Sequence, residues 1–280
     1  MAAVDGLLNG SPNPDQPKAI SFSASADPGP LHRSEWLKFV SFFYNMELEA
    51  EEVFSKIAAN YECTKAMAAA DVPASDRPGV AFISYSSFST PPEFVVSVAD
   101  YKLALVADAG ARNVDTSNMT VQISSWSGLP SHVGFNTSGE MWDYLSAQNV
   151  SVIVDESYSP DPVGYNLTSF LLTYNVSALP AGVKTVLRED GILSVGGGLD
   201  WFEGAIVMAD AVLQDLAGGI YGHVEGEAEP LRLWFRDLTA GAQPLTLMAD
   251  DCPDVLGPNP WNDVARTCDS IDVAFQGYGH

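Results

Sequence analysis

Positive charge is scarce in this 280-residue chain. Thirteen lysines and arginines stand against 36 aspartates and glutamates, which gives a formal net charge of -23. A surface this acidic repels phosphate backbones and anionic lipid headgroups, so nucleic acids and charged membrane surfaces are not expected partners. Apolar residues still make up 46% of the chain, and we therefore expect a buried core rather than disorder.

Long hydrophobic runs, metal-ligand pairs and a leader sequence are also missing. No stretch approaches the roughly 18 apolar residues that span a bilayer. The first residues, MAAVDG, have neither the basic nor the apolar part of a signal peptide. The four histidines and three cysteines include no pair with the spacing of zinc ligands. We therefore expect no metal site and no cofactor.

What the chain does contain is a group of N-glycosylation sequons. The five sequons begin at Asn118, Asn136, Asn149, Asn166 and Asn175, and none has proline in the middle position. A single Asn-x-Ser/Thr arises often by chance, but five so close together indicate a secretory origin. We expect a secreted or cell-surface protein whose N-terminus is processed or truncated.

The cysteines fit an oxidising compartment. Cys252 and Cys268 lie 16 residues apart in a tail rich in Pro, Asp and Asn, which predicts a disulfide between them. Cys63 is then left over, and we expect a buried thiol at the end of a helix.

Helical and strand patterns alternate along the chain. Residues 34–62 have an amphipathic pattern with Ser34 as the expected N-cap and an interruption at Asn45, which predicts one kinked helix or two packed helices. Apolar strands are expected at 80–84, 94–97, 150–154 and 192–195, with helices at about 98–109, 138–145, 167–174, 201–216 and 230–238. This alternation predicts an α/β fold with a mostly parallel sheet flanked by helices. We divide the chain into a flexible lead-in (1–33), a hinge helix (34–62), an α/β ligand-binding unit (78–245) and a tail (246–280).

In open α/β sheets, ligands bind beyond the carboxyl ends of the strands. This rule selects seven candidate binding residues: Tyr85, Ser86, Glu156, Tyr158, Asp200, Trp201 and Phe202. Their rings and few carboxylates suit a large, partly apolar small molecule. Each has a structural alternative, since the rings could belong to the core or the rim, Asp200 could be a helix N-cap, and Glu156 could be a solvated loop acid.

No pattern of a catalytic site is evident. The chain lacks a G-x-S-x-G motif and a nucleophile with a nearby base. The glycine run 196–198 lacks the spacing and the lysine of phosphate-binding loops, and Asp200 and Glu203 next to it would repel phosphate. The one enzymatic alternative is a secreted glycan hydrolase that uses Glu156 with Asp200 or Glu203. We assign no catalytic residue.

The order of these patterns resembles a known family. Residues 42–54, FFYNMELEAEEVF, are similar to the linker helix of helix-hinged, periplasmic-type substrate-binding proteins, and residues 109–114, AGARNV, resemble a turn of that family. Residues 140–154 and 183–195 resemble two further elements of it. The resemblance extends over about residues 30–240 and looks strongest to the algal cobalamin acquisition proteins.

This resemblance implies a noncatalytic, two-lobed binder that captures cobalamin and passes it to a membrane transporter or receptor. Iron-siderophore or haem binding is the alternative, and we expect a monomer. In the family about half of the protein precedes the linker helix, whereas here only residues 18–23 could belong to that first lobe. We therefore expect the first lobe to be missing from this chain.

Overall fold

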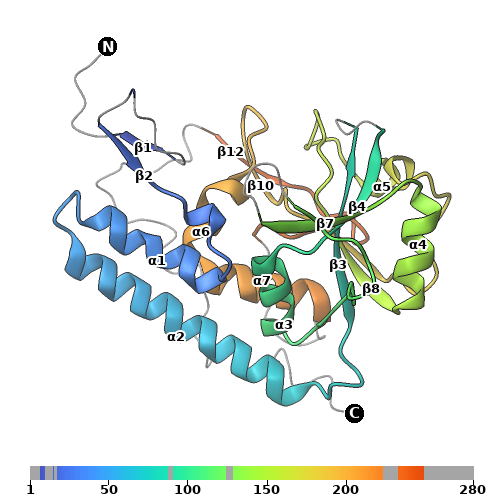
Figure 1. Ribbon diagram of the computed structural model, residues 1–280, viewed down its shortest axis with the longest axis horizontal. Helices are drawn as coiled ribbons and strands as arrows, with labels where there is room; N and C mark the ends of the chain where they lie inside the picture. Colours follow the sequence, from blue (N-terminus) through green and yellow to red (C-terminus); the bar gives the residue numbers. More distant parts are fainter. Residues whose placement is uncertain are drawn as a thin grey trace.

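Three parallel strands form the centre of an eight-stranded sheet. The computed structural model describes residues 7–9, 15, 18–87, 91–123, 129–222 and 233–248. The strand order is β11-β9-β8-β3-β4-β7-β6, and β5 pairs with β3 outside this path. Figure 1 labels β3, β4, β7 and β8 of this sheet. The strands are β3 (Gly79–Ser86), β4 (Glu93–Ser97), β5 (Arg112–Asn113), β6 (Gln122–Ile123), β7 (Pro130–Phe135), β8 (Val150–Asp155), β9 (Thr185–Arg188) and β11 (Arg236–Asp237).

The sheet is mixed rather than mostly parallel. Among the described strands, β5 and β8 run parallel to β3 and β9 runs parallel to β8, while β4, β7, β6 and β11 join by antiparallel pairings. A parallel crossover needs a dozen or more residues, and the short link from β3 to β4 allows only a hairpin. The expected α/β fold with a helix-flanked sheet is confirmed, but the parallel direction holds only for the central strands.

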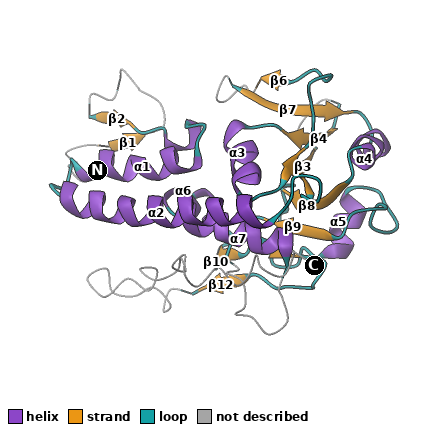
Figure 2. Ribbon diagram, turned by 90° about the horizontal axis from the view of Figure 1, so that it is seen from below, coloured by secondary structure: helices purple, strands orange, loops and turns teal. Residues whose placement is uncertain are grey.

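Helices cover both faces of the sheet. They are α3 (Asp100–Asp108), α4 (Ser138–Ala147), α5 (Leu167–Thr173), α6 (Gly204–Val207) and α7 (Ala209–Tyr221), with 3-10 turns η1 (Ala24–Ala26) and η2 (Asp200–Phe202) (Figure 2). Along β3, Val80 and Phe82 join the core under α3 and α7, whereas Ala81 and Ile83 join the core under α4 and α5. This alternation follows from the two-residue period of a strand. No described helix has the length and apolarity that a membrane crossing would need.

The segment expected as a single hinge helix is two helices, α1 (Pro30–Ser41) and α2 (Glu47–Asp71). Asn45 has a φ of 55°, and the left-handed backbone there ends α1 and starts the return of the chain. The two helices lie side by side in both views, and Lys38 of α1 is 2.9 Å from Glu51 of α2. The prediction of a single kinked helix over residues 34–62 is therefore wrong, and the alternative of two packed helices is confirmed.

Ser34 does not begin α1, which starts four residues earlier at Pro30. Its hydroxyl is buried, accepts a hydrogen bond from the backbone N–H of Ala209 at 3.3 Å and contacts the carbonyl of Ile206 at 3.4 Å. Ala209 is the first residue of α7. Ser34 thus satisfies an unpaired N–H at the start of another helix and ties α1 to α6 and α7.

Three further expectations need correction. The strand expected at 192–195 is β10 (Ile192–Ser194), which pairs with β12 (Leu245–Leu247) in a separate sheet. Its place in the main sheet belongs to β9, whose apolar run, Val186-Leu187, is too short to stand out. The helix expected at 201–216 is divided into η2, α6 and α7, and residues 233–238 of the last expected helix contain β11 instead.

The expected strand at 18–23 is present as β2 (Ala19–Ser21), paired with β1 (Leu7–Asn9).

The five sequon asparagines are all exposed. Asn149 and Asn175 have φ values of 52° and 51° after α4 and α5, and Asn166 is the N-cap of α5. Asparagine is favoured at such positions for backbone reasons alone, so three sequons have a structural explanation. Glycosylation at the five sites stays a prediction.

Cys63 lies within α2 and is disulfide-bonded, so the expected leftover thiol is wrong. Cys252 and Cys268 lie outside the described residues, and their pairing stays a prediction. A bond to Cys63 competes with that pairing, because the chain has only three cysteines.

Candidate functional site

A cavity of about 380 Å³ lies where α1 meets the α/β part of the chain. Five parts of the chain contribute to its wall: η1, α1, α3, the η2–α6 segment and α7. The lining residues are Ser25, Pro30, Arg33, Tyr101, Leu105, Trp201, Phe202, Ala205, Ile206, Ala209 and Val212. Most are apolar or aromatic, and Arg33 is the only charged residue among them. Mostly apolar walls with few polar groups are typical of small-molecule sites.

Arg33 and Tyr101 form the polar part of this wall. The guanidinium carbon of Arg33 lies 3.5 Å from the centre of the Tyr101 ring, which is a cation–π contact. Burial lowers the pKa of Arg33, although Tyr101 and Asp27 act in the opposite direction. Burial also raises the pKa of the Tyr101 hydroxyl to about 12. At neutral pH the pair therefore presents a cation and an uncharged phenol.

Arg33 is held by carbonyl groups rather than by a carboxylate. Its Nε donates to the carbonyl of Asp27 at 2.9 Å, and its Nη2 donates to the carbonyl of Ser25 at 2.6 Å. The carboxylate of Asp27 lies 3.5 Å from His32 instead. Within the described ranges, no carboxylate forms an ion pair with Arg33.

Next to Tyr101, the ionisable side chains of Lys102 and Glu189 are buried and that of Glu156 is partly buried. Lys102 of α3 forms an ion pair with Glu156, and its ammonium also donates to Ser97 at 3.3 Å. Burial would lower the pKa of Lys102, but the charge of Glu156 raises it above the usual value. Glu189 is buried beside them, and burial followed by the charge of Glu156 raises its pKa well above the usual range. None of these three residues lines the cavity.

The seven predicted binding residues are not brought together. Trp201 and Phe202 line the cavity; Trp201 is buried and packs edge-on to Phe235, whereas Phe202 is 67% exposed. Asp200, beside them, accepts a hydrogen bond from the indole of Trp234 at 2.8 Å. Asp200 is not among the lining residues, and its structural alternative as a helix N-cap is wrong as well, because Leu199 is the N-cap of η2.

The other four lie outside the cavity. The carboxylate of Glu156 is occupied by Lys102, as described above. Tyr85 and Ser86 end β3, where the ring of Tyr85 stacks against Phe94 at 5.0 Å. Tyr158 is 72% exposed. A single ligand in this cavity would not contact these four residues.

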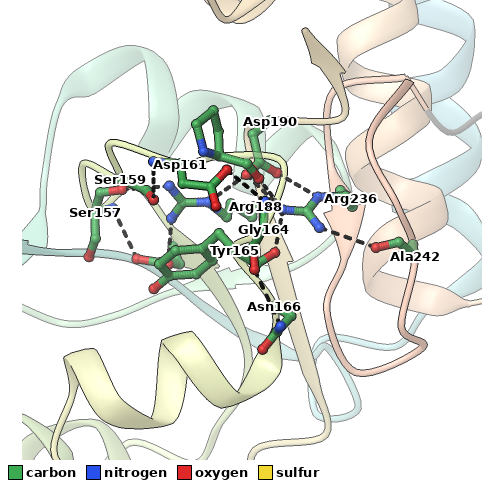
Figure 3. Close-up of polar contacts among 12 residues, drawn as sticks. Ser157, Ser159, Asp161, Gly164, Tyr165, Asn166, Arg188, Asp190, Arg236 and Ala242 are labelled. Carbon is green, nitrogen blue, oxygen red and sulfur yellow. Dashed lines mark hydrogen bonds and ion pairs between the residues drawn. The ribbon is translucent and has the colours of Figure 1, made fainter. Parts of the chain in front are cut away.

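A neutral ion-pair network fills the carboxyl ends of β8 and β9 (Figure 3). Arg188 donates to Asp155 and Asp190 at 2.7 Å each, and Arg236 donates to both carboxylate oxygens of Asp190 at 2.7 Å. All four side chains are buried. Two arginines and two aspartates cancel in charge, so none of these four side chains is left as an unpaired ion for a ligand.

The same network fixes the loop after β8. Arg188 also donates to the carbonyl of Ser157 at 2.6 Å and stacks over the ring of Tyr165. Arg236 donates to the carbonyl of Tyr165 at 2.9 Å. Figure 3 shows both guanidinium groups facing this loop. The loop after β8, which we expected to contact a ligand, is thus fixed in place by hydrogen bonds from Arg188 and Arg236.

Sequence reasoning missed Arg33 and Tyr101. They are 68 residues apart in the sequence, on α1 and α3, and only the packing of these helices brings them together. The available signal was the scarcity of basic residues, which makes each cation without an acidic neighbour a candidate. Among the described residues, no group of His, Cys, Asp and Glu side chains could hold a metal ion.

The arrangement is similar to that of several solved structures. A periplasmic haem-binding protein from Pseudomonas aeruginosa has a TM-score of 0.49 at 15% identity, over 79% of this chain and 68% of that one. An ABC transporter substrate-binding protein from Listeria monocytogenes has a TM-score of 0.45 at 16% identity, over 74% and 69%. The haem-binding protein RhuT from Roseiflexus, solved in apo form, has a TM-score of 0.45 at 14% identity, over 75% and 74%. Likeness at this level does not identify a ligand, and the sequence matches no protein-family model and no curated protein.

Proposed function

We propose that this chain binds a small organic solute outside the cytoplasm and passes it to a membrane transporter or receptor. The observation that carries the proposal is the cavity between α1, α3, η2–α6 and α7, which combines aromatic walls with one guanidinium. Its volume of about 380 Å³ lies near the lower end of the roughly 300–1,000 Å³ that small-molecule sites occupy. The exposed sequons support an extracytoplasmic location.

Cobalamin and an iron chelate or haem are the two finer candidates. A corrinoid exceeds this cavity, so most of it would have to lie on the outer surface, where Phe202 offers an exposed ring. Haem is smaller, and its carboxylates suit Arg33. The raised pKa of Tyr101 disfavours the phenolate form that an iron ligand needs. Contacts to the rim or the carboxylates of haem are therefore better supported than direct iron ligation.

The enzymatic alternative has little support. A glycosidase needs one carboxyl group as acid and a second as base or nucleophile. Glu156 is paired with Lys102, and Asp200 accepts the hydrogen bond of Trp234. Both candidate carboxylates therefore have packing partners, and we propose a binding protein rather than a hydrolase.

Quenching of tryptophan fluorescence tests the proposal, because Trp201 lines the cavity. The wild-type protein is titrated with cyanocobalamin, haemin and a ferric siderophore. Ala205→Leu places a larger side chain in the cavity wall, and Ala59→Leu on the exposed side of α2 is the matched control. We expect Ala205→Leu to weaken binding at least about tenfold, which corresponds to roughly 1.4 kcal/mol, and Ala59→Leu to leave it unchanged.

The outcomes separate the candidates. Quenching by cyanocobalamin alone supports the corrinoid, and quenching by haemin or the siderophore alone supports the iron-chelate alternative. Equal binding by wild type and a folded Ala205→Leu variant would place the site elsewhere and contradict the proposal. Circular dichroism of each variant establishes that it folds.

A further inference from the structure

We propose that the cavity selects a carboxylate-bearing, otherwise apolar ligand, with Arg33 as the residue that binds the carboxylate. This inference rests on the proposed function and narrows its ligand class. It concerns the chemistry of one end of the ligand, whichever source supplies it. Among the described residues that line the cavity, Arg33 is the only one with a formal charge.

Arg33 has no carboxylate in an ion pair among the described residues, and the charge of Asp27 and the Tyr101 side chain offset its burial only in part. A cation that is partly removed from water is costly unless an opposite charge or several hydrogen bonds compensate it. Arg188 and Arg236, which are fully buried, each pair with aspartates at 2.7 Å. Arg33 has two carbonyl partners and, among described residues, no carboxylate in an ion pair. The chain has 36 acidic residues, and none of those that the structure describes forms an ion pair with this cation.

The guanidinium of Arg33 is held in one orientation. Its Nε and Nη2 are engaged by the carbonyls of Asp27 and Ser25, and these contacts fix the plane of the group over Tyr101. No hydrogen bond from Nη1 to a described residue is present. A guanidinium held in one orientation loses little entropy when it binds a carboxylate, which favours recognition.

The remainder of the cavity wall is mostly apolar. Leu105, Trp201, Ala205 and Val212 offer apolar surface around the cation. Such a wall favours a ligand with an apolar body, because a small, fully hydrated anion would leave the apolar surface exposed to water. The net charge of -23 does not prevent an anion from binding, since charges beyond a Debye length of about 8 Å are screened at physiological salt. The combination fits an apolar carboxylate.

A purely structural role for Arg33 predicts something different. Its bonds to Ser25 and Asp27 also join α1 to η1 and the residue that follows it. If this were its whole role, replacing it would lower stability but would not change the preference between charged and neutral ligands. The decisive readout is therefore ligand discrimination rather than stability.

The experiment compares two probes of nearly equal shape, 2-naphthoate and its neutral analogue 2-naphthamide, by isothermal titration calorimetry. For the wild-type protein we expect the carboxylate to bind roughly 10- to 100-fold more tightly than the amide, as for hydrogen bonds to charged groups. Arg33→Gln is expected to abolish this ratio, and Arg33→Lys to retain part of it. Arg112→Gln is the matched control, because Arg112 donates only to carbonyls and lies outside the cavity.

The possible results are distinct. Equal binding of both probes to wild type, with Ala205→Leu weakening both, would overturn the selection of a carboxylate and leave solute binding standing. A ratio that persists in folded Arg33→Gln would overturn the role of Arg33. Binding of neither probe, together with none of the tetrapyrroles or the siderophore, would overturn the proposed function itself. If Arg33→Gln fails to fold, the wild-type ratio and Arg33→Lys still decide the proposal.

Discussion

Replacing Arg236 by methionine is expected to destabilise the protein strongly. Arg236 is buried and, within the part of the chain that the structure describes, provides the only hydrogen bond to one carboxylate oxygen of Asp190, with a second bond to the other oxygen. Asp190 is fully buried, so the variant leaves its charge with Arg188 as the one remaining partner. The carbonyls of Tyr165 and Ala242 lose a donor as well.

The expected loss follows from the charge count. The wild-type network holds two positive and two negative groups, and Arg236→Met leaves one buried negative charge without a counter-ion. Breaking a buried ion pair from one side costs about 3–5 kcal/mol. Arg112→Met is the control, since Arg112 is half-buried and its guanidinium caps carbonyls near the end of α4. We expect a loss of at most about 1 kcal/mol there.

Urea denaturation followed by far-UV circular dichroism measures both variants. The double variant Arg236→Met/Asp190→Asn removes one charge of each sign and leaves Arg188 paired with Asp155. It should therefore be less unstable than the sum of the two single variants, with a coupling of about 0.5–3 kcal/mol. A loss below about 1 kcal/mol for Arg236→Met, or strict additivity in the double variant, would refute the reasoning.

Two further predictions concern titration and glycosylation. Because burial raises the pKa of Glu189 well above its usual value of 4.5, the folded state keeps a proton that the unfolded chain loses, and stability falls as the pH rises above that value. Glu189→Gln should flatten this decline when unfolding is measured across pH, and parallel curves for the two proteins would contradict it. Asn166→Asp keeps the acceptor for the N–H groups of Thr168 and Ser169 but destroys the sequon, so a secretory host should yield protein of lower mass with stability changed by less than about 0.5 kcal/mol. Asn166→Ala should lose both the glycan and about 1 kcal/mol, and an unchanged mass in Asn166→Asp would show that the site is unoccupied.

Local patterns determined how much of the fold was predictable. The strand at 150–154 is apolar because both of its faces are buried, and Thr137 with Glu140 forms the capping box that starts α4. The boundary between α1 and α2 depended on Asn45, whose left-handed backbone ends one helix and lets the chain fold back. That choice between a kink and a turn is set by the packing of α1 on α2, so the sequence pattern permitted both.

The candidate site was less predictable because it depends on long-range packing. The rule that ligands bind at the carboxyl ends of strands pointed to the loop after β8. In the structure, Asp155 and Arg188 at those ends neutralise each other and close that position. A sequence cannot show this, since the partner residues come from separate strands and the choice of partner depends on register.

For locating the binding site, a cation without an ion-pair partner among the described residues, such as Arg33, is therefore a better criterion than a loop at the carboxyl end of a strand. A ligand bound between β8 and β9 would have to displace Asp190 or Arg236 from a buried pair, at a cost that few ligand contacts repay. A carboxylate at Arg33 displaces no ion pair among the described residues and adds a counter-ion to a cation that burial has partly desolvated. A carboxylate that binds at Arg33 therefore contributes its full binding free energy. A ligand that binds at the ends of β8 and β9 would first have to break an existing ion pair. This difference favours the cavity beside α1 as the binding site.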